Sequence, residues 1–204
     1  MKIFSTTLIA LVIAVSLTAC GGSEGRKEKY LEQGISKFEA GDLEKARVSF
    51  KNVLQIDPKD IKGRYWLGYT MEKLQEYRTA AGYYSAVLEI DQAHHQAKVR
   101  LARIMLMARD DKGALEKAKE LLEVDPKDPD GLTIRAGVHS VRGDVTNAMA
   151  DALEAYKIAP DNSLLYSTYY DGSGCEFGAG ITIDDDDCPI ISVFTDSRYL
   201  PMVV

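Results

Sequence analysis

The sequence of 204 residues has little cysteine and no excess of positive charge. Three cysteines are too few for a scaffold held by disulfides, and none of them forms the Cys-x-x-Cys pair typical of zinc and thioredoxin-like centres. The 25 basic residues are outnumbered by 31 acidic ones, so we expect no nucleic-acid partner. With 46% hydrophobic and 27% charged residues, the composition is that of an ordinary globular protein.

The sequence also lacks the motifs that carry enzyme chemistry. No Walker or dinucleotide-binding glycine pattern occurs, and Ser173 lacks the strand-turn-helix setting of a nucleophile elbow. The aspartate run over 184–187 lacks the ligand spacing and the central glycine of a calcium loop. We therefore expect no catalysis, no metal site, no cofactor and no small-molecule substrate.

The N-terminal residues 1–19 have the layout of a secretory signal peptide. Lys2 is followed by an apolar run over 8–15 and by small residues just before Cys20. This apolar run is shorter than the ~20 residues that a helix needs to cross a membrane. The segment therefore predicts export followed by cleavage before Cys20.

Residues 17–20, Leu-Thr-Ala-Cys, resemble the lipobox of bacterial lipoproteins, in which the cysteine becomes the lipidated first residue of the mature chain. The resemblance implies acyl chains, palmitate among them, on Cys20, and these suffice for stable anchoring in a membrane. Because Gly21 is not aspartate, it also implies the periplasmic side of the outer membrane. We expect residues 20–26 to form a lipidated, flexible tether.

A period of 34 residues organises the body of the chain. Ala46, Ala80, Ala114 and Ala148 follow one another at this interval, and the segment Asp-Pro-Lys-Asp occurs twice at twice the interval. Each period holds two amphipathic stretches separated by a short break. The pattern predicts an all-α fold of four helical hairpins, which we call repeats one to four. Their ranges are 27–60, 61–94, 95–128 and 129–162.

The repeats resemble the tetratricopeptide repeat (TPR) family. Repeat two has Gly68 at the small position of the first helix, Ala80 at the close-packed position of the second, and Tyr84 at its aromatic position. The resemblance implies a right-handed superhelix that binds a protein or peptide in its concave groove. The carboxylate clamp known in this family is not matched, because Leu31 and Ile35 stand where lysine and asparagine are needed.

The groove of this family is lined by the first helix of each repeat. Tyr65 and Tyr69 lie four residues apart, so we expect them to present two rings side by side as ligand anchors. The alternative, that the apolar residues of repeat one pack in the interior, stays open. The residues that the resemblance places in the groove are Leu31, Ile35, Phe38, Lys62, Tyr65, Tyr69, Glu72, Gln96, Val99, Arg103 and Leu106.

The segment 163–204 breaks the period and carries seven acids against one base. We expect an irregular or short-β acidic tail, with strands over 181–183 and 190–194. Three interpretations remain open: a β-hairpin appendage closed by a disulfide between Cys175 and Cys188, a disordered acidic end, or foreign sequence created by a frameshift. The abrupt change of composition and period at one place favours the frameshift.

These features predict a lipid-anchored adaptor for a partner protein. Lipobox, short tether and immediate repeats together resemble the TPR lipoproteins of exopolysaccharide export and PEP-CTERM protein sorting, which implies a role in cell-envelope assembly. Two alternatives remain: a pilotin-like lipoprotein that escorts a secretin in type IV pilus assembly, and a subunit of an envelope hydrolase.

Overall fold

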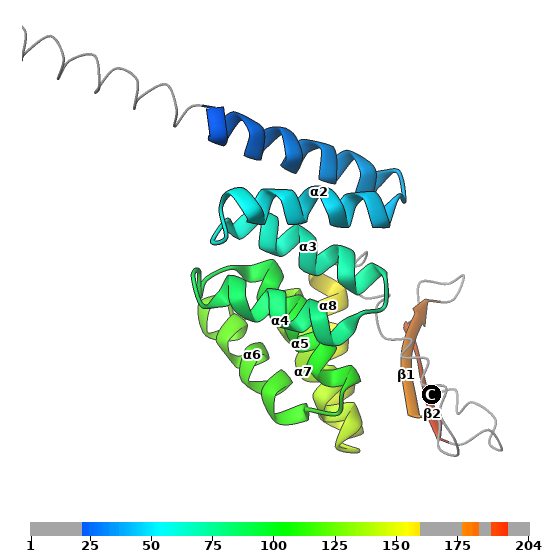
Figure 1. The fold of residues 1–204 in the computed structure, drawn as a ribbon. Coiled ribbons are helices and arrows are strands. Elements are labelled where there is room, and N and C mark those ends of the chain that lie inside the picture. The colour runs from blue at the N-terminus through cyan, green and yellow to red at the C-terminus, as the bar shows by residue number, and fades with distance from the viewer. Residues whose placement is uncertain (1–21, 160–176, 184–188, 196–204) are drawn as a thin grey trace, which may run out of the picture. The chain divides into compact units, whose positions relative to one another are not determined.

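The computed structural model describes residues 22–159 and the backbone of two strands, over 177–183 and 189–195 (Figure 1). The predictions for the signal peptide, Cys20, Cys175 and Cys188 fall outside the described residues. The chain divides into two compact units between His94 and His95, and we describe each unit by itself.

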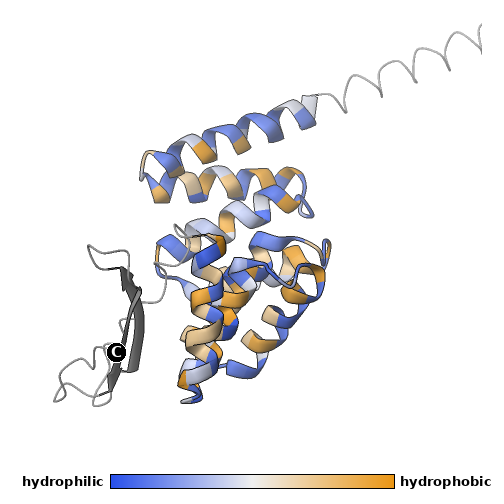
Figure 2. Ribbon diagram, turned by 180° about the vertical axis from the view of Figure 1, so that it is seen from behind, coloured by the Kyte–Doolittle hydropathy of each residue, from blue (hydrophilic) through white to orange (hydrophobic). Residues whose placement is uncertain are grey.

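The first unit holds two helical hairpins. A helix over 22–39 pairs with α2 (Leu43–Ile56), and α3 (Ile61–Lys73) pairs with α4 (Tyr77–Leu88). Hydrophobic and hydrophilic residues alternate along these helices, as their amphipathic patterns predict (Figure 2).

The second unit repeats the same arrangement twice. Its helices are α5 (His95–Met107), α6 (Asp111–Val124), α7 (Pro129–Val141) and α8 (Val145–Ile158). The core between α5, α6 and α7 is built from small and branched side chains, including Ala114 and Ala118, which are fully buried. The predicted all-α hairpin array is therefore present in both units.

The turn between the two helices of every hairpin contains one residue in the left-handed backbone region. These residues are Gly41, Gln75, Arg109 and Gly143, with φ angles of 78°, 62°, 62° and 76°, and they lie 34 residues apart. Glycine adopts this conformation without strain, whereas glutamine and arginine do not. The 34-residue period is thus written into the backbone as well as into the side chains.

Small residues let the two helices of a hairpin approach each other. A Cβ atom built on Gly34 would lie within 3.0 Å of the buried Phe50 ring, and one on Gly68 would lie 3.0 Å from Tyr84. Ala46, Ala80 and Ala114 are fully buried, and Ala148 is half-buried.

The expected flexible tether is corrected where the structure describes it, because residues 22–26 already belong to the first helix. Lys27 explains the difference. Its ammonium group lies 2.8 Å from Glu24 in the same helix, and 3.2 and 3.0 Å from Asp57 and Asp60 of the next turn. Hydrogen bonding to Glu24, and then to the two aspartates, raises the pKa of Lys27 well above its usual range. These ion pairs fix the start of the helix.

The strands β1 (Phe177–Ile183) and β2 (Pro189–Thr195) form an antiparallel pair in which Ile181 lies opposite Ile191. They include both predicted strand segments. Among the described residues, no helix combines the length and the apolar character needed to span a bilayer.

Candidate peptide-binding site

The candidate site lies in the first unit and is built from half-buried rings. We call Phe38, Tyr65, Trp66, Tyr69 and His94 the aromatic cluster. The Phe38 ring lies 4.6 Å from that of Tyr69 and 5.4 Å from that of Trp66. At the other end, the rings of Tyr65 and His94 stack at 5.1 Å. Such ring pairs contribute about 0.5–1.5 kcal/mol each beyond the area they bury.

Helix α3 positions most of the cluster. It begins after Asp60, whose carboxylate accepts a hydrogen bond of 2.7 Å from the Gly63 backbone N–H and so caps the helix. Tyr65 and Tyr69 are four residues apart and therefore share a helix face, with ring centroids 6.4 Å apart. This contact confirms that the two rings lie side by side.

Two fully buried rings support the cluster from below. Phe50 stacks on Trp66 at 6.0 Å, and Tyr84 lies 6.0 Å from Tyr65. The Tyr84 hydroxyl donates a 2.7 Å hydrogen bond to Glu72. The supporting layer is thus rigid, while the rings above it are half-exposed and able to meet a ligand.

Positive charge borders the cluster. The Lys73 ammonium lies 5.6 Å from the centroid of the Tyr69 ring, within the range of a cation–π contact. Lys62, on the same helix, is exposed. A ligand that places an apolar or aromatic side chain on these rings therefore meets lysine side chains at the edge.

The structure changes part of the predicted groove. Leu31, Val99 and Leu106 are only 4%, 2% and 6% exposed, so they belong to the core and are not available to a ligand. Glu72 is engaged by Tyr84, as described above. Ile35 is half-buried and Gln96 is exposed. Apolar residues at groove positions were open to either role, and burial decides for the core.

Three residues of the site were not among the predicted groove residues: Trp66, Lys73 and His94. Trp66 is the single tryptophan of the chain and stands two positions after the place that the family pattern gives to tryptophan. That displacement was the available signal. It moves the indole into contact with Phe38 and Phe50.

In the second unit the predicted groove residue Arg103 is engaged internally. Its Nη2 atom donates a 2.9 Å hydrogen bond to Asp130, while its buried Nε has no partner. His95, Asp128 and Asp130 could each offer a metal ligand, because their ligand atoms lie within 4.8 Å of one another. Protein groups already bind these atoms: His95 Nε2 lies 2.9 Å from Asp128, and Asp128 caps α7. The arrangement suits an ion-pair network better than a metal site.

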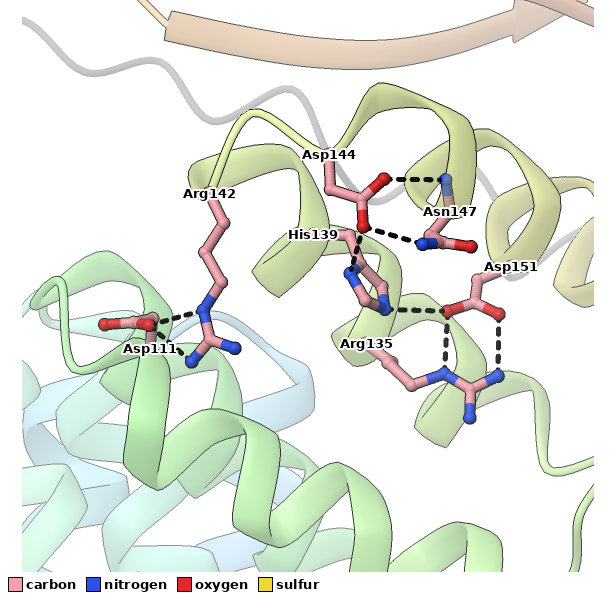
Figure 3. Close-up of polar contacts among 7 residues, drawn as sticks. All are labelled: Asp111, Arg135, His139, Arg142, Asp144, Asn147 and Asp151. Atoms are coloured by element: carbon pink, nitrogen blue, oxygen red, sulfur yellow. Dashed lines mark hydrogen bonds and ion pairs between the residues drawn. The ribbon is translucent and has the colours of Figure 1, made fainter.

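A second polar network occupies repeat four (Figure 3). Asp151, 8% exposed, accepts two hydrogen bonds from Arg135, and His139 lies 3.8 Å from the same carboxylate. Asp144 lies 3.4 Å from the other nitrogen of His139 and caps α8 through the Asn147 backbone N–H. Every charge of this network is paired within the protein, so it serves the fold.

Family models agree with the helical geometry. A model described as TPR repeat matches residues 34–75, and one described as tetratricopeptide repeat matches 72–129 and 99–163. The chain carries tetratricopeptide repeats. A curated relative, human tetratricopeptide repeat protein 6, is 25% identical over 142 residues, which are 70% of this chain but only 26% of that protein.

Solved TPR structures share the fold. A TPR protein from Parabacteroides merdae superposes with a TM-score of 0.62 at 18% identity, covering 67% of this chain and 53% of that one. MamA from Desulfovibrio magneticus gives 0.61 at 18% identity, covering 66% and 76%. YrrB, described as a TPR protein with an unusual peptide-binding site, gives 0.56 at 15% identity, covering 65% and 69%. At these identities the likeness concerns the fold alone.

Proposed function

We propose that this TPR protein is a lipid-anchored adaptor that binds a partner protein through an extended or helical peptide laid on the aromatic cluster. The observation that carries the proposal is the row of half-exposed rings in contact from Phe38 through Tyr69 and Tyr65 to His94. A stable core does not require rings to remain partly exposed, whereas binding hot spots are enriched in tyrosine and tryptophan. A peptide-binding site in YrrB, a protein of the same fold, supports this use of the repeats.

The chemistry of the cluster defines the ligand. Apolar or aromatic side chains of the peptide fill the spaces between the rings, and the tyrosine hydroxyls satisfy its backbone polar groups. Lys62 and Lys73 add positive charge at the edge, which favours a peptide with an acidic residue beside its apolar anchor.

The cell envelope is the proposed location. The lipobox places the acyl chains on Cys20 and the repeats directly after it, which holds the binding site close to a membrane surface. We propose the periplasmic side of the outer membrane, and a role in envelope assembly, exopolysaccharide export or protein sorting. Replacement Cys20→Ser tests the anchor: the variant should accumulate as unprocessed precursor or as a soluble protein. Fractionation of the variant with outer membranes after cleavage would refute the lipid assignment.

Trp66 provides a direct test of the binding site. Because the chain has one tryptophan and it lies in the aromatic cluster, its fluorescence reports on ligands that reach the cluster. The full chain, purified from the envelope in detergent, should capture a partner from solubilised membranes, and addition of that partner should shift the Trp66 emission. Tyr65→Ala and Tyr69→Ala should each weaken binding by roughly tenfold or more, as expected for an anchor residue.

Tyr77→Ala is the matched control, because Tyr77 is an exposed tyrosine of α4 outside the cluster. Thermal melting of all three variants separates binding from folding, since Tyr65 also packs on Tyr84. Loss of the partner by Tyr65→Ala and Tyr69→Ala with unchanged melting supports the site. Equal capture by all variants would place the binding surface elsewhere.

A further inference from the structure

A second hollow lies in the first unit, away from the aromatic cluster, and shares no residue with it. It has a volume of about 440 Å³ and is walled by Leu54, Pro58, Tyr83 and Ala86. Gly82 and Arg64 complete its lining, and each has a feature that the fold does not explain.

Gly82 lies in the interior of α4, where glycine destabilises a helix by about 1 kcal/mol relative to alanine. A Cβ atom at this position would meet nothing within 4 Å. Packing therefore does not require glycine here, in contrast to Gly34, where the Phe50 ring fills the space. The equivalent positions 34 residues away hold Val48 and Glu116. The missing side chain leaves the hollow open to the backbone of a ligand.

Arg64 is held in a fixed orientation by two backbone carbonyls. Its Nε donates to the Pro58 carbonyl at 2.9 Å, and its Nη1 donates to the Ala86 carbonyl at 3.0 Å. Three of the five guanidinium N–H donors remain after these two bonds. Among residues 22–159, no carboxylate forms an ion pair with Arg64. Asp57 feels its charge, but the Asp57 oxygens are bound by Lys27 and by the Lys59 backbone N–H.

Repeat three shows what repeat two lacks. The residues 34 positions after Arg64 and Ala86 are Lys98 and Glu120, and they form an ion pair of 2.9 Å. Glu120 also pairs with Lys117, the counterpart of Tyr83. Burial of Glu120 favours its neutral form, but hydrogen bonds from Lys117 and Lys98 outweigh that effect and lower its pKa. Repeat three thus supplies its own carboxylate, whereas repeat two has an alanine in that place.

We propose that the hollow is a second peptide-binding site, in which a carboxylate of a partner peptide binds Arg64 while the peptide backbone passes over Gly82. The ligand carboxylate takes the place that Glu120 fills in repeat three. An apolar side chain of the peptide packs between Leu54 and Tyr83. A planar guanidinium fixed by two carbonyls binds a carboxylate with little loss of rotamer entropy. The carboxylate is either the C-terminus of the peptide or an acidic side chain.

Three dye-labelled peptides distinguish these sources when they are titrated by fluorescence anisotropy against the full chain in detergent. The first, Leu-Ala-Leu-Gly-Leu, has a free C-terminal carboxylate. The second, Leu-Ala-Glu-Gly-Leu, is amidated and keeps only the side-chain carboxylate. The third is the first peptide in amidated form, without any carboxylate. We expect saturable binding of the first or the second peptide, and none of the third.

Ala86→Glu places a carboxylate beside Arg64, as Glu120 does beside Lys98, and should lower the affinity by about tenfold by occupying the arginine from within. Ala150→Glu is the matched control, because it adds the same charge at an exposed alanine of α8. Gly82→Ala fills the hollow without changing charge, and should weaken binding while leaving the helix intact.

The location of binding is read from the Gly82 amide resonance of the labelled chain, and from Trp66 emission as a control. A shift at Gly82 with unchanged Trp66 emission supports the proposal. Binding that shifts only Trp66 belongs to the aromatic cluster and would overturn it. Equal affinity of the wild-type chain and Ala86→Glu, with both folded by thermal melting, would also overturn it, as would the absence of saturable binding by either carboxylate peptide.

Discussion

Arg135 and Asp151 form a two-point ion pair inside repeat four, in which Nε and Nη2 donate to the two carboxylate oxygens at 2.7 and 2.6 Å (Figure 3). The position of Arg135 belongs to leucine in repeats two and three, where Leu67 and Leu101 are buried. Hydrogen bonding to Asp151 raises the pKa of Arg135 above its already high value. The fourth hairpin has therefore replaced an apolar contact by a paired charge.

Removal of one partner should destabilise the repeat more than removal of both. Asp151→Ala leaves the Arg135 guanidinium without its carboxylate, and we expect a loss of about 2–3 kcal/mol in unfolding free energy. The double variant Arg135→Leu with Asp151→Ser uses residue types found at these positions in other repeats, and should lie within about 1 kcal/mol of wild type. Urea denaturation followed by circular dichroism measures both. A double variant less stable than Asp151→Ala would contradict this account.

The comparison of repeats also shows how far the sequence could predict the structure. The 34-residue spacing of Ala46, Ala80 and Ala114 predicts the hairpins, because one small residue per period is a steric requirement for close helix packing. Periodicity assigns a residue to a position but not to a partner. It could not show that Arg135 pairs with Asp151, because that contact depends on two departures from the pattern that compensate each other.

The candidate site was predictable to a similar degree. Tyr65 and Tyr69 follow from helix geometry alone, since residues four apart share a face. The burial of Leu31 does not follow, because an apolar residue on a repeat helix suits a groove and a core equally well. Residues 22–26 were expected to be flexible on account of their glycines, yet long-range ion pairs of Lys27 fix the helix that contains them.

Close packing in repeat one predicts opposite effects for two glycines of the same helix. Gly34→Ala would bring a Cβ atom within 3.0 Å of the fully buried Phe50 ring, and we expect a loss of about 1–3 kcal/mol in stability. Gly25→Ala meets nothing within 4 Å and should gain about 0.5–1 kcal/mol from its higher helix propensity. Thermal melts of both variants test this difference. If the two substitutions shift the midpoint in the same direction, the contact between Gly34 and Phe50 is not tight.

The pair formed by Asp111 and Arg142 predicts a pH effect. A hydrogen bond from Arg142 holds the pKa of Asp111 below its usual value of 3.8. Because the folded pKa is lowered, this carboxylate stabilises the protein above its unfolded pKa, and the contribution is lost as the pH falls through the folded pKa. Between about pH 5 and pH 3, the unfolding free energy of Asp111→Asn should therefore fall less than that of wild type.

Glu116→Gln serves as the control for this pH series, because it removes an exposed carboxylate from the same helix. Chemical denaturation across the pH range gives the unfolding free energy for each chain. We expect the control to follow the wild-type curve. Parallel curves for wild type and Asp111→Asn would show that the ion pair contributes nothing to acid sensitivity.

The left-handed turn residues predict a further difference between repeats that share one backbone. Gln75 has a φ angle of 62°, in a region that costs an L-residue with a side chain about 1–2 kcal/mol, whereas Gly143 occupies the equivalent turn without that strain. Gln75→Gly should raise the unfolding free energy by about 0.5–1 kcal/mol, because relief of strain exceeds the added entropy of the unfolded chain. Gly143→Ala should lower it by about 1 kcal/mol or more, and Gln75→Ala should give no gain. Melting midpoints of the three variants, measured under one condition, decide the matter: a neutral Gly143→Ala would mean that these turns relax out of the left-handed region when the glycine is lost.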